Sequence, residues 1–267
     1  MPLGARVRTI VLTPCSDPFV LALRSDPRVR MMLFDSDPNS ARKAQMQTLN
    51  RDVRVLVLGA SLSSTSLNNR LATLAASLVE EKGGTPDAAT IDAFDCPFYD
   101  RDIELETGPP VGARHFCERL KAADAVMIAS PEYNASVPAA IKNLIDWGSR
   151  FRPQPFNGKH ALLLSASPSM VGGNRGLWAL RIPLEHLGTR VYPDMFSLAQ
   201  AHQAFADNSR LKDAALQERL ERTLGCFLEL VEAAKHYAHL KKVWIEFLGE
   251  HPNAATDRVE ESDVVAA

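Results

Sequence analysis

The chain has 267 residues, of which 46% are hydrophobic and 23% charged, so it is long and apolar enough to bury a full core as an ordinary soluble protein. A formal net charge of -2 gives no global electrostatic reason to expect nucleic acid or an anionic membrane as a partner. No apolar run reaches the roughly 18 residues of a membrane span. Because the first residues also lack the apolar block of a signal peptide, we expect a cytoplasmic protein.

Residues 1–50 carry the weakest structural pattern of the chain. Two short apolar segments, 7–13 and 29–34, could form strands, and Asp-Pro pairs punctuate the sequence around them with turns. A separate functional domain needs more length than this. We therefore predict a peripheral N-terminal extension over residues 1–50.

The pattern changes at Val53, where a nearly continuous apolar run of β-branched residues begins. Residues 53–58 suit a central parallel strand that is covered on both faces, and the run ends at Gly59. From Leu67 to Leu78, apolar residues recur at helical spacing. The sequence therefore predicts one strand, a polar loop and one helix.

This alternation repeats along the chain. Further strands are predicted at 90–94, 125–129, 161–164 and 190–192, with helices between them and a closing helix over 216–231. Pro183 predicts a kink in the helix at 176–187, or its division into two short helices. Strands that alternate with helices predict an α/β domain with a mostly parallel sheet, over residues 51–240, followed by a C-terminal tail at 241–267.

A polar loop follows the first strand and leads directly into a helix. Five of its residues between 61 and 66 carry hydroxyl groups, and the glycines of a GxGxxG dinucleotide motif are missing. Backbone N–H groups and the positive end of the helix dipole favour a phosphate there, so the loop fits a terminal monophosphate better than a pyrophosphate. The alternative is that these hydroxyl groups only cap the helix.

Two more loops are predicted at the same edge, because the carboxyl ends of parallel strands point the same way. The loop at 130–137 offers hydrogen bonds and the aromatic face of Tyr133 to a flat heteroaromatic ligand. The loop at 165–176 contains Gly172 and Gly173, which let backbone approach a ligand closely. Taken separately, Tyr133 also fits an ordinary surface tyrosine, and the glycines also fit a mobile linker.

The loop after the third strand continues into a helix with a specific pattern. Its motif is Pro131-Glu132-Tyr133-Asn134, followed by Ser136, Pro138, Lys142, Asn143, Asp146 and Trp147. With the other two loops, it resembles the NAD(P)H-dependent FMN reductase family of flavodoxin-like proteins, whose members include reductases of quinones, azo dyes and chromate. The resemblance covers residues 53–206 and implies a flavodoxin-like, doubly wound, five-stranded parallel sheet of order 2-1-3-4-5.

The resemblance also implies which positions would bind FMN. The phosphate would be held by the first loop, through Ser61, Ser66 and Asn68, with Ser63 beside them. The isoalloxazine ring would contact the second loop, through Pro131, Glu132, Tyr133 and Asn134. The third loop would line the other side of the ring, through Ser167, Gly172 and Gly173.

Ser63 departs from the family pattern, because members commonly carry an arginine two residues after the first serine of the loop. Without that cation, the phosphate loses a charge-assisted hydrogen bond of a kind worth roughly 1.5–3 kcal/mol. We therefore expect weaker FMN binding, or a substitute charge from Arg70 or a partner subunit. Arg175 could attract the phosphate of NADPH, although it also fits an ordinary surface arginine.

The activity implied is a hydride relay from NADH or NADPH through FMN to a small-molecule acceptor: a flavin, a quinone, an azo compound or an oxyanion. Such a relay needs no protein nucleophile or metal. The four cysteines form no CxxC pair, and His236 and His239 have no third ligand, so we expect no metal site. The resemblance implies a homodimer or homotetramer. Two alternatives remain: an FMN-binding electron carrier or redox-regulated interaction protein without nicotinamide turnover, and a member that has lost flavin.

Overall fold

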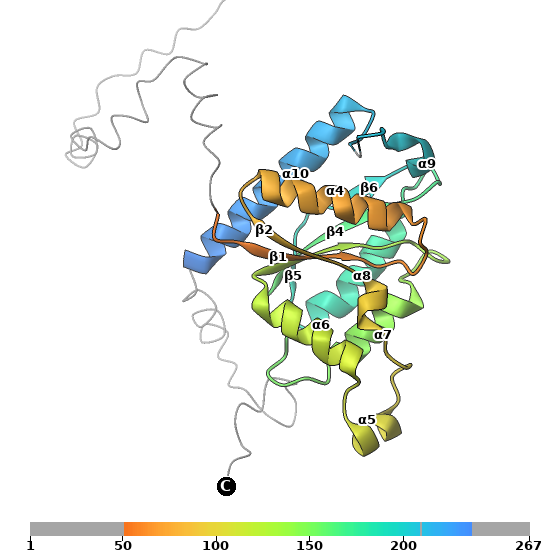
Figure 1. Cartoon of the computed structure of the whole chain (residues 1–267), viewed down its shortest axis with the longest axis vertical. Helices are drawn as coiled ribbons and strands as arrows, with labels where there is room; N and C mark the ends of the chain where they lie inside the picture. The colour runs from red at the N-terminus through yellow and green to blue at the C-terminus, as the bar shows by residue number, and fades with distance from the viewer. Residues whose placement is uncertain (1–50, 209, 237–267) are drawn as a thin grey trace, which may run out of the picture. The chain divides into compact units, whose positions relative to one another are not determined.

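The computed structural model describes residues 51–208 and 210–236 (Figure 1). The predicted extension over residues 1–50, its two candidate strands and the predicted tail at 241–267 lie outside the described residues. No helix among the described residues is long and apolar enough to cross a membrane.

The sheet of the described region has six strands, and every pair of neighbours runs parallel. The order along the sheet is β2-β1-β3-β4-β5, and β6 also pairs with β4. The strands are β1 (Arg54–Gly59), β2 (Thr85–Thr90), β3 (Ala125–Ala129), β4 (His160–Ala166), β5 (Arg190–Val191) and β6 (Phe196–Leu198). This order confirms the expected doubly wound α/β sheet.

The strand predicted at 190–192 is shorter than expected, and a second short strand follows it. β5 pairs with the start of β4, while β6 pairs with Leu164, Ser165 and Ala166 at the end of β4. Pro193 lies between the two and cannot donate a hydrogen bond to a ladder. β5 and β6 therefore share one place beside β4.

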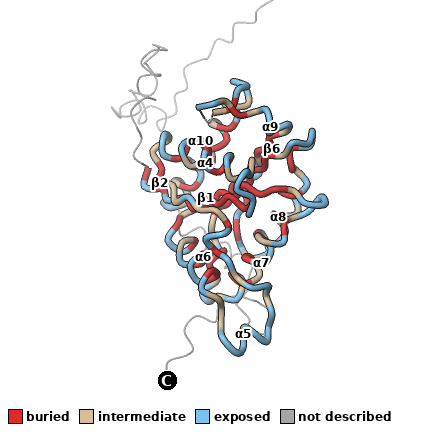
Figure 2. The backbone as a smooth tube through the Cα atoms, turned by 45° about the vertical axis from the view of Figure 1, so that its right-hand side comes forward, coloured by how far each residue is buried: buried red, intermediate tan, exposed pale blue. Residues whose placement is uncertain are grey.

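The central strand β1 is buried on both faces, as its apolar run predicted (Figure 2). Val55 and Val57 pack into one apolar cluster, and Leu56 and Leu58 pack into another, because alternate side chains of a strand point to opposite faces. Each fully buried valine or leucine contributes about 1.5–3 kcal/mol relative to exposure.

Helices cover both faces of the sheet (Figure 1). One cluster includes residues of α4 (Leu67–Glu81) and α10 (Ala214–His236). The other includes residues of α6 (Val111–Ala122), α7 (Ala139–Gly148) and α8 (Asn174–His186). The loops that enter α4, α7 and α8 follow β1, β3 and β4, so they share one edge of the sheet.

The predicted strand at 90–94 is wrong. β2 ends at Thr90, and Ile91–Phe94 form a short 3-10 helix, η1. Ile91 and Phe94 are both buried, and side chains three residues apart lie on the same side of a 3-10 helix. β2 itself is an edge strand and carries Pro86, which an edge tolerates, so it lacks the apolar pattern of a central strand.

One of the two predicted alternatives for α8 does not occur, and one helix was not predicted. α8 continues through Pro183 to His186, so the predicted division into two short helices does not occur. Pro183 cannot donate to the carbonyl of Ala179, and α8 continues for only three residues beyond it. The short helix α5 (Arg101–Thr107) was not predicted, because none of its residues is buried and it carries no apolar face. The small helix α9 (Ala201–Ala204) follows β6.

Candidate functional site

The three predicted loops meet at the carboxyl ends of adjacent strands. Ala60 donates its backbone N–H to Ala129, and Ser130 donates to Leu164, both at 2.9 Å. These bonds continue the strand register past the ends of β1 and β3. The loops after β1, β3 and β4 therefore begin side by side, where an open α/β sheet binds its ligand.

The first loop presents neutral hydrogen-bond donors ahead of α4. Ser66 caps the helix, because its Oγ accepts from the N–H groups of Asn68 and Asn69 at 3.2 Å each. Ser61 Oγ accepts from Ser63 N at 3.3 Å. Within the described residues, the exposed backbone N–H groups of Ser64 and Thr65 have no hydrogen-bond partner. Free N–H groups beside a helix N-terminus fit an anion such as a terminal phosphate.

The side chain of Asn68 has a structural role that the sequence did not reveal. Its side chain is buried, and its amide exchanges two hydrogen bonds with the backbone of Ala166, each 2.9 Å long. These bonds use both polar atoms of the amide. Asn68 therefore ties the start of α4 to the end of β4 and fixes the first loop against the third.

Arg70 is engaged elsewhere than in the first loop. Its guanidinium donates to the carbonyl of Ala206 at 3.1 Å and lies 4.6 Å from the ring centroid of Phe205. The expected substitute charge for the phosphate is thus held by the segment after α9 in this structure. The side chains of the first loop itself carry no charge.

The second loop is a tight turn. Tyr133 and Ser136 exchange backbone hydrogen bonds at 3.0 and 3.1 Å, and the two residues between them, Asn134 and Ala135, have φ angles of 52° and 61°. Two central residues with positive φ define a type I′ turn. A non-glycine residue in this region costs roughly 1–2 kcal/mol, so the loop stores backbone strain. The turn leaves Tyr133 54% exposed beside the sheet edge.

Glu132 faces the third loop through its carboxylate. Oε2 accepts from the backbone N–H groups of Arg175 and Gly176, and Oε1 accepts from the guanidinium of Arg175. Burial raises the pKa of this carboxyl, but the hydrogen bonds from Arg175 and Gly176 outweigh burial and leave the pKa below its usual value. Glu132 is therefore ionised at neutral pH and Arg175 is paired with it.

The third loop depends on two glycines with positive φ, Gly172 at 66° and Gly173 at 84°. A Cβ atom at Gly173 would lie only 2.0 Å from Ser165 Oγ, so no side chain fits there. The remaining predicted residue, Ser167, bonds through its hydroxyl to Ser169 Oγ at 3.0 Å and through its N–H to Leu198. The third loop thus has a closely packed backbone of fixed shape.

The helical half of the motif supports the loop at 96–99. Trp147 is fully buried and donates its indole N–H to the carbonyl of Pro97 at 2.7 Å. Asn143 donates to the same carbonyl at 2.9 Å and accepts from Tyr99 N at 2.8 Å. Lys142 and Asp146 pair along the exposed side of α7. These residues position α7, which starts directly after the second loop.

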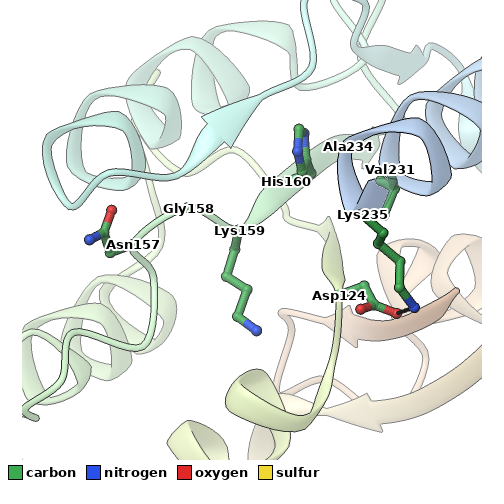
Figure 3. A pocket seen from close by; sticks show the side chains of 8 residues that line it. All are labelled: Asp124, Asn157, Gly158, Lys159, His160, Val231, Ala234 and Lys235. Atoms are coloured by element: carbon green, nitrogen blue, oxygen red, sulfur yellow. Dashed lines mark hydrogen bonds and ion pairs between the residues drawn. The ribbon is translucent and has the colours of Figure 1, made fainter. Parts of the chain in front are cut away.

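A pocket at the opposite edge of the sheet is formed by other residues (Figure 3). Asp124 precedes β3, and Lys235 reaches it from α10, with an Nζ to Oδ2 distance of 3.1 Å. Lys159 donates to the carbonyl of Lys121 at 3.1 Å. The pocket lies at the amino ends of β3 and β4, and none of the predicted site residues lines it. Lys235 and Lys159 hold neighbouring segments together at this edge.

Comparisons with known proteins show the family of the chain. Residues 53–203 match the family model described as NADPH-dependent FMN reductase. An NAD(P)H-dependent FMN reductase of Pseudomonas aeruginosa is 35% identical over 181 residues, which cover 66% of this chain and 94% of that protein. A quinone reductase of Escherichia coli is 30% identical over 192 residues, which cover 70% of this chain and 100% of that protein.

A solved structure resembles the chain as well. FerB, a flavoenzyme NAD(P)H:(acceptor) oxidoreductase from Paracoccus denitrificans, superimposes with a TM-score of 0.57 and 27% sequence identity. The match covers 68% of this chain and 98% of FerB. The chain therefore belongs to the NADPH-dependent FMN reductase family of FMN-using NAD(P)H oxidoreductases.

Proposed function

We propose that this chain binds FMN across the three loops and passes reducing equivalents from NADH or NADPH to a quinone. The observation that carries the proposal is the meeting of an uncharged phosphate-type loop, an aromatic turn and a glycine turn at one sheet edge. The chemistry that FMN supplies when bound is hydride acceptance at its N5 atom and delivery of electrons to an acceptor.

The residues of the first loop would bind the phosphate. Ser61, Ser63 and Ser66 offer hydroxyl groups, and the free N–H groups of Ser64 and Thr65 lie among them. The Oγ atom of Ser66 already accepts hydrogen bonds as the cap of α4. Its hydroxyl hydrogen can still be donated to a phosphate. The donors are all neutral, so the loop recognises the shape of a phosphate more than its charge.

The second and third loops would bind the ring. Pro131 is buried at the base of the turn, and Tyr133 and Asn134 project from it. The backbone at Gly172 and Gly173 can approach a flat ligand closely because neither residue has a side chain. N–H groups of the third loop would face negative charge that develops on a reduced ring.

A quinone fits the surroundings of this edge better than a metal oxyanion. Three large apolar side chains on the two ring-binding loops are exposed: Tyr133, Met170 and Val171. An aromatic face and two apolar side chains favour a flat, apolar acceptor. Arg175 is the cation of the third loop. Because it is paired with Glu132, its charge is less available to attract an oxyanion.

Anaerobic titration of purified protein with NADH and NADPH, followed by a quinone, tests the proposal. We expect a visible flavin spectrum after addition of FMN, bleaching by either nicotinamide, and recovery of absorbance with benzoquinone but slow recovery with chromate. An electron carrier would bind FMN and show negligible bleaching. A preparation that stays colourless with FMN would show that flavin has been lost.

We also propose that the chain forms a homo-oligomer. Trp178 and Ile182 lie one turn apart on α8 and are both exposed, at 57% and 71%. Exposed large apolar side chains on one helix face are typical of surfaces that another subunit covers. α8 begins at the third loop, so this contact would lie close to the flavin site.

A further inference from the structure

α8 begins without a cap of its own. The first N–H groups of a helix have no intrahelical partner, and a side chain at the N-cap position normally accepts from them. The N-cap residue of α8 is Gly173, which has no side chain. Any residue with a Cβ is excluded there, because Ser165 Oγ occupies that position and φ is positive.

Glu132 supplies the missing acceptor from another loop. Its Oε2 lies 2.9 Å from Arg175 N and 3.1 Å from Gly176 N, which are two of the N–H groups in the first turn of α8. Its Oε1 lies 2.8 Å from Arg175 Nε and 2.6 Å from the terminal guanidinium nitrogen. The Glu132 side chain is 9% exposed and that of Arg175 is 60% exposed, so the acceptor lies in the fold and the guanidinium reaches it from the surface.

The backbone contact between the two loops is equally close. A Cβ atom at Gly176 would lie 3.1 Å from both Cα and Cβ of Glu132. A glycine at this position lets the first turn of α8 pack directly on the second loop. The cap, the ion pair and this contact involve the same two segments.

We propose that Glu132 is a positioning residue: it caps α8 from the second loop and so holds the second and third loops as one unit. Arg175 is part of this clamp and neutralises the carboxylate, which leaves no unpaired negative charge beside a bound anionic ligand. Glu132 acts on the flavin through Gly172, Gly173 and α8. Only the prediction about FMN binding, given below, rests on the proposed function.

Four variants separate the cap from the charge. Glu132→Ala removes every bond of the carboxylate. Glu132→Gln keeps one oxygen for the two backbone N–H groups and loses the ion pair. Arg175→Gln keeps the cap and loses the cation. Glu185→Ala is the matched control, because it removes an ion pair of the same length, 2.6 Å to Arg181, from the same helix but away from the loops.

Hydrogen exchange on the flavin-free protein reports the clamp directly. We expect exchange of the Arg175 and Gly176 amides to accelerate about tenfold in Glu132→Ala and less than about threefold in the other three variants. Unchanged exchange in Glu132→Ala would overturn the proposal. If that variant does not fold, Glu132→Asp replaces it: the charge stays, but the shorter side chain no longer reaches both N–H groups, so exchange must still accelerate.

The FMN-binding arm distinguishes positioning from direct contact. We expect the FMN dissociation constant to rise about tenfold in Glu132→Ala and to stay within about threefold in Glu132→Gln, with the spectrum of bound flavin unchanged. If Glu132→Gln is as impaired as Glu132→Ala, the charge itself contacts the ligand and the proposal fails. Wild-type protein that does not bind FMN contradicts the proposed function alone, since the exchange result stands without flavin.

Discussion

Ser63 is the residue at which this chain differs most clearly from the pattern that its first loop resembles. We predict that Ser63→Arg tightens FMN binding about tenfold or more, because a charge-assisted hydrogen bond to phosphate contributes about 1.5–3 kcal/mol. Fluorescence titration with FMN measures the change. Riboflavin, which lacks the phosphate, is the control ligand, and Ser63→Gln is the neutral control of similar length. An equal gain for riboflavin would show that residue 63 does not face the phosphate.

Asn68 was predicted to hold phosphate, which stays a prediction; in the structure, both polar atoms of its side-chain amide bond to the backbone of Ala166. We predict that Asn68→Ala lowers the free energy of unfolding by about 2 kcal/mol or more, because each buried group left unpaired costs about 1–3 kcal/mol. Urea denaturation measures the loss. Thr73→Ala, on the exposed side of the same helix, should stay within about 0.5 kcal/mol of wild type. Equal losses of unfolding free energy in Asn68→Ala and Thr73→Ala would contradict the structural role of the Asn68 amide.

Among the elements, α10 closes one face of the sheet and is fastened by Lys235 to Asp124 and Asp52. Burial lowers the pKa of this amine, but its hydrogen bonds with the two carboxylates outweigh burial and raise the pKa above its usual value. A group with a raised folded-state pKa stabilises the folded protein while it is charged. The contribution of Lys235 is therefore complete below its unfolded-state pKa of about 10.4, and it is lost as pH rises through its folded-state pKa.

We therefore predict that the difference in unfolding free energy between wild type and Lys235→Met is constant from pH 6 to about pH 10 and shrinks above it. The difference itself should be about 1 kcal/mol, because the amine is only partly buried. Denaturation curves at several pH values measure it. A difference that stays constant through the alkaline range would mean that the charge of Lys235 contributes nothing to the attachment of α10.

The elements that sequence alone predicted well are those with a strong apolar period. β1, β3 and β4 are buried on both faces, and α4 and α10 carry regular apolar stripes, so each was found near its true bounds. β2 and α5 were missed because an edge strand with a proline and a helix without buried residues have no such period. Their structure depends on tertiary pairing, which local patterns do not encode.

The positions of the site loops could be predicted from the sequence, but the contacts between them could not. Loop positions follow from the parallel topology, so the meeting of the three loops could be derived from the strand pattern. The bonds of Glu132 with Arg175 and Gly176 join residues more than forty positions apart, as the sequence separations of 43 and 44 show. No local motif reports such a bond, because it depends on where the sheet places α8. The site's supporting contacts therefore required the fold.

For the whole molecule, the surface of α8 bears on assembly. We predict a species heavier than the 29.3 kDa chain in light scattering, and a shift toward 29.3 kDa in Ile182→Glu, because a buried charge opposes subunit contact. Leu105→Glu adds the same charge at a similarly exposed apolar position on α5 and should leave assembly unchanged. If Leu105→Glu dissociates the oligomer instead, the subunit contact lies on α5. A monomeric wild type would show that the chain forms no homo-oligomer.

The central claim is that the three loops form a flavin site that accepts reducing equivalents from a nicotinamide. The most direct measurement is an anaerobic visible spectrum of purified protein with added FMN, recorded during stepwise addition of NADH or NADPH. The account predicts a shifted flavin spectrum on binding, followed by bleaching with about one equivalent of nicotinamide for each bound flavin, since one hydride carries two electrons. A flavin that binds but is not bleached by either nicotinamide, or protein that does not bind FMN, would contradict it.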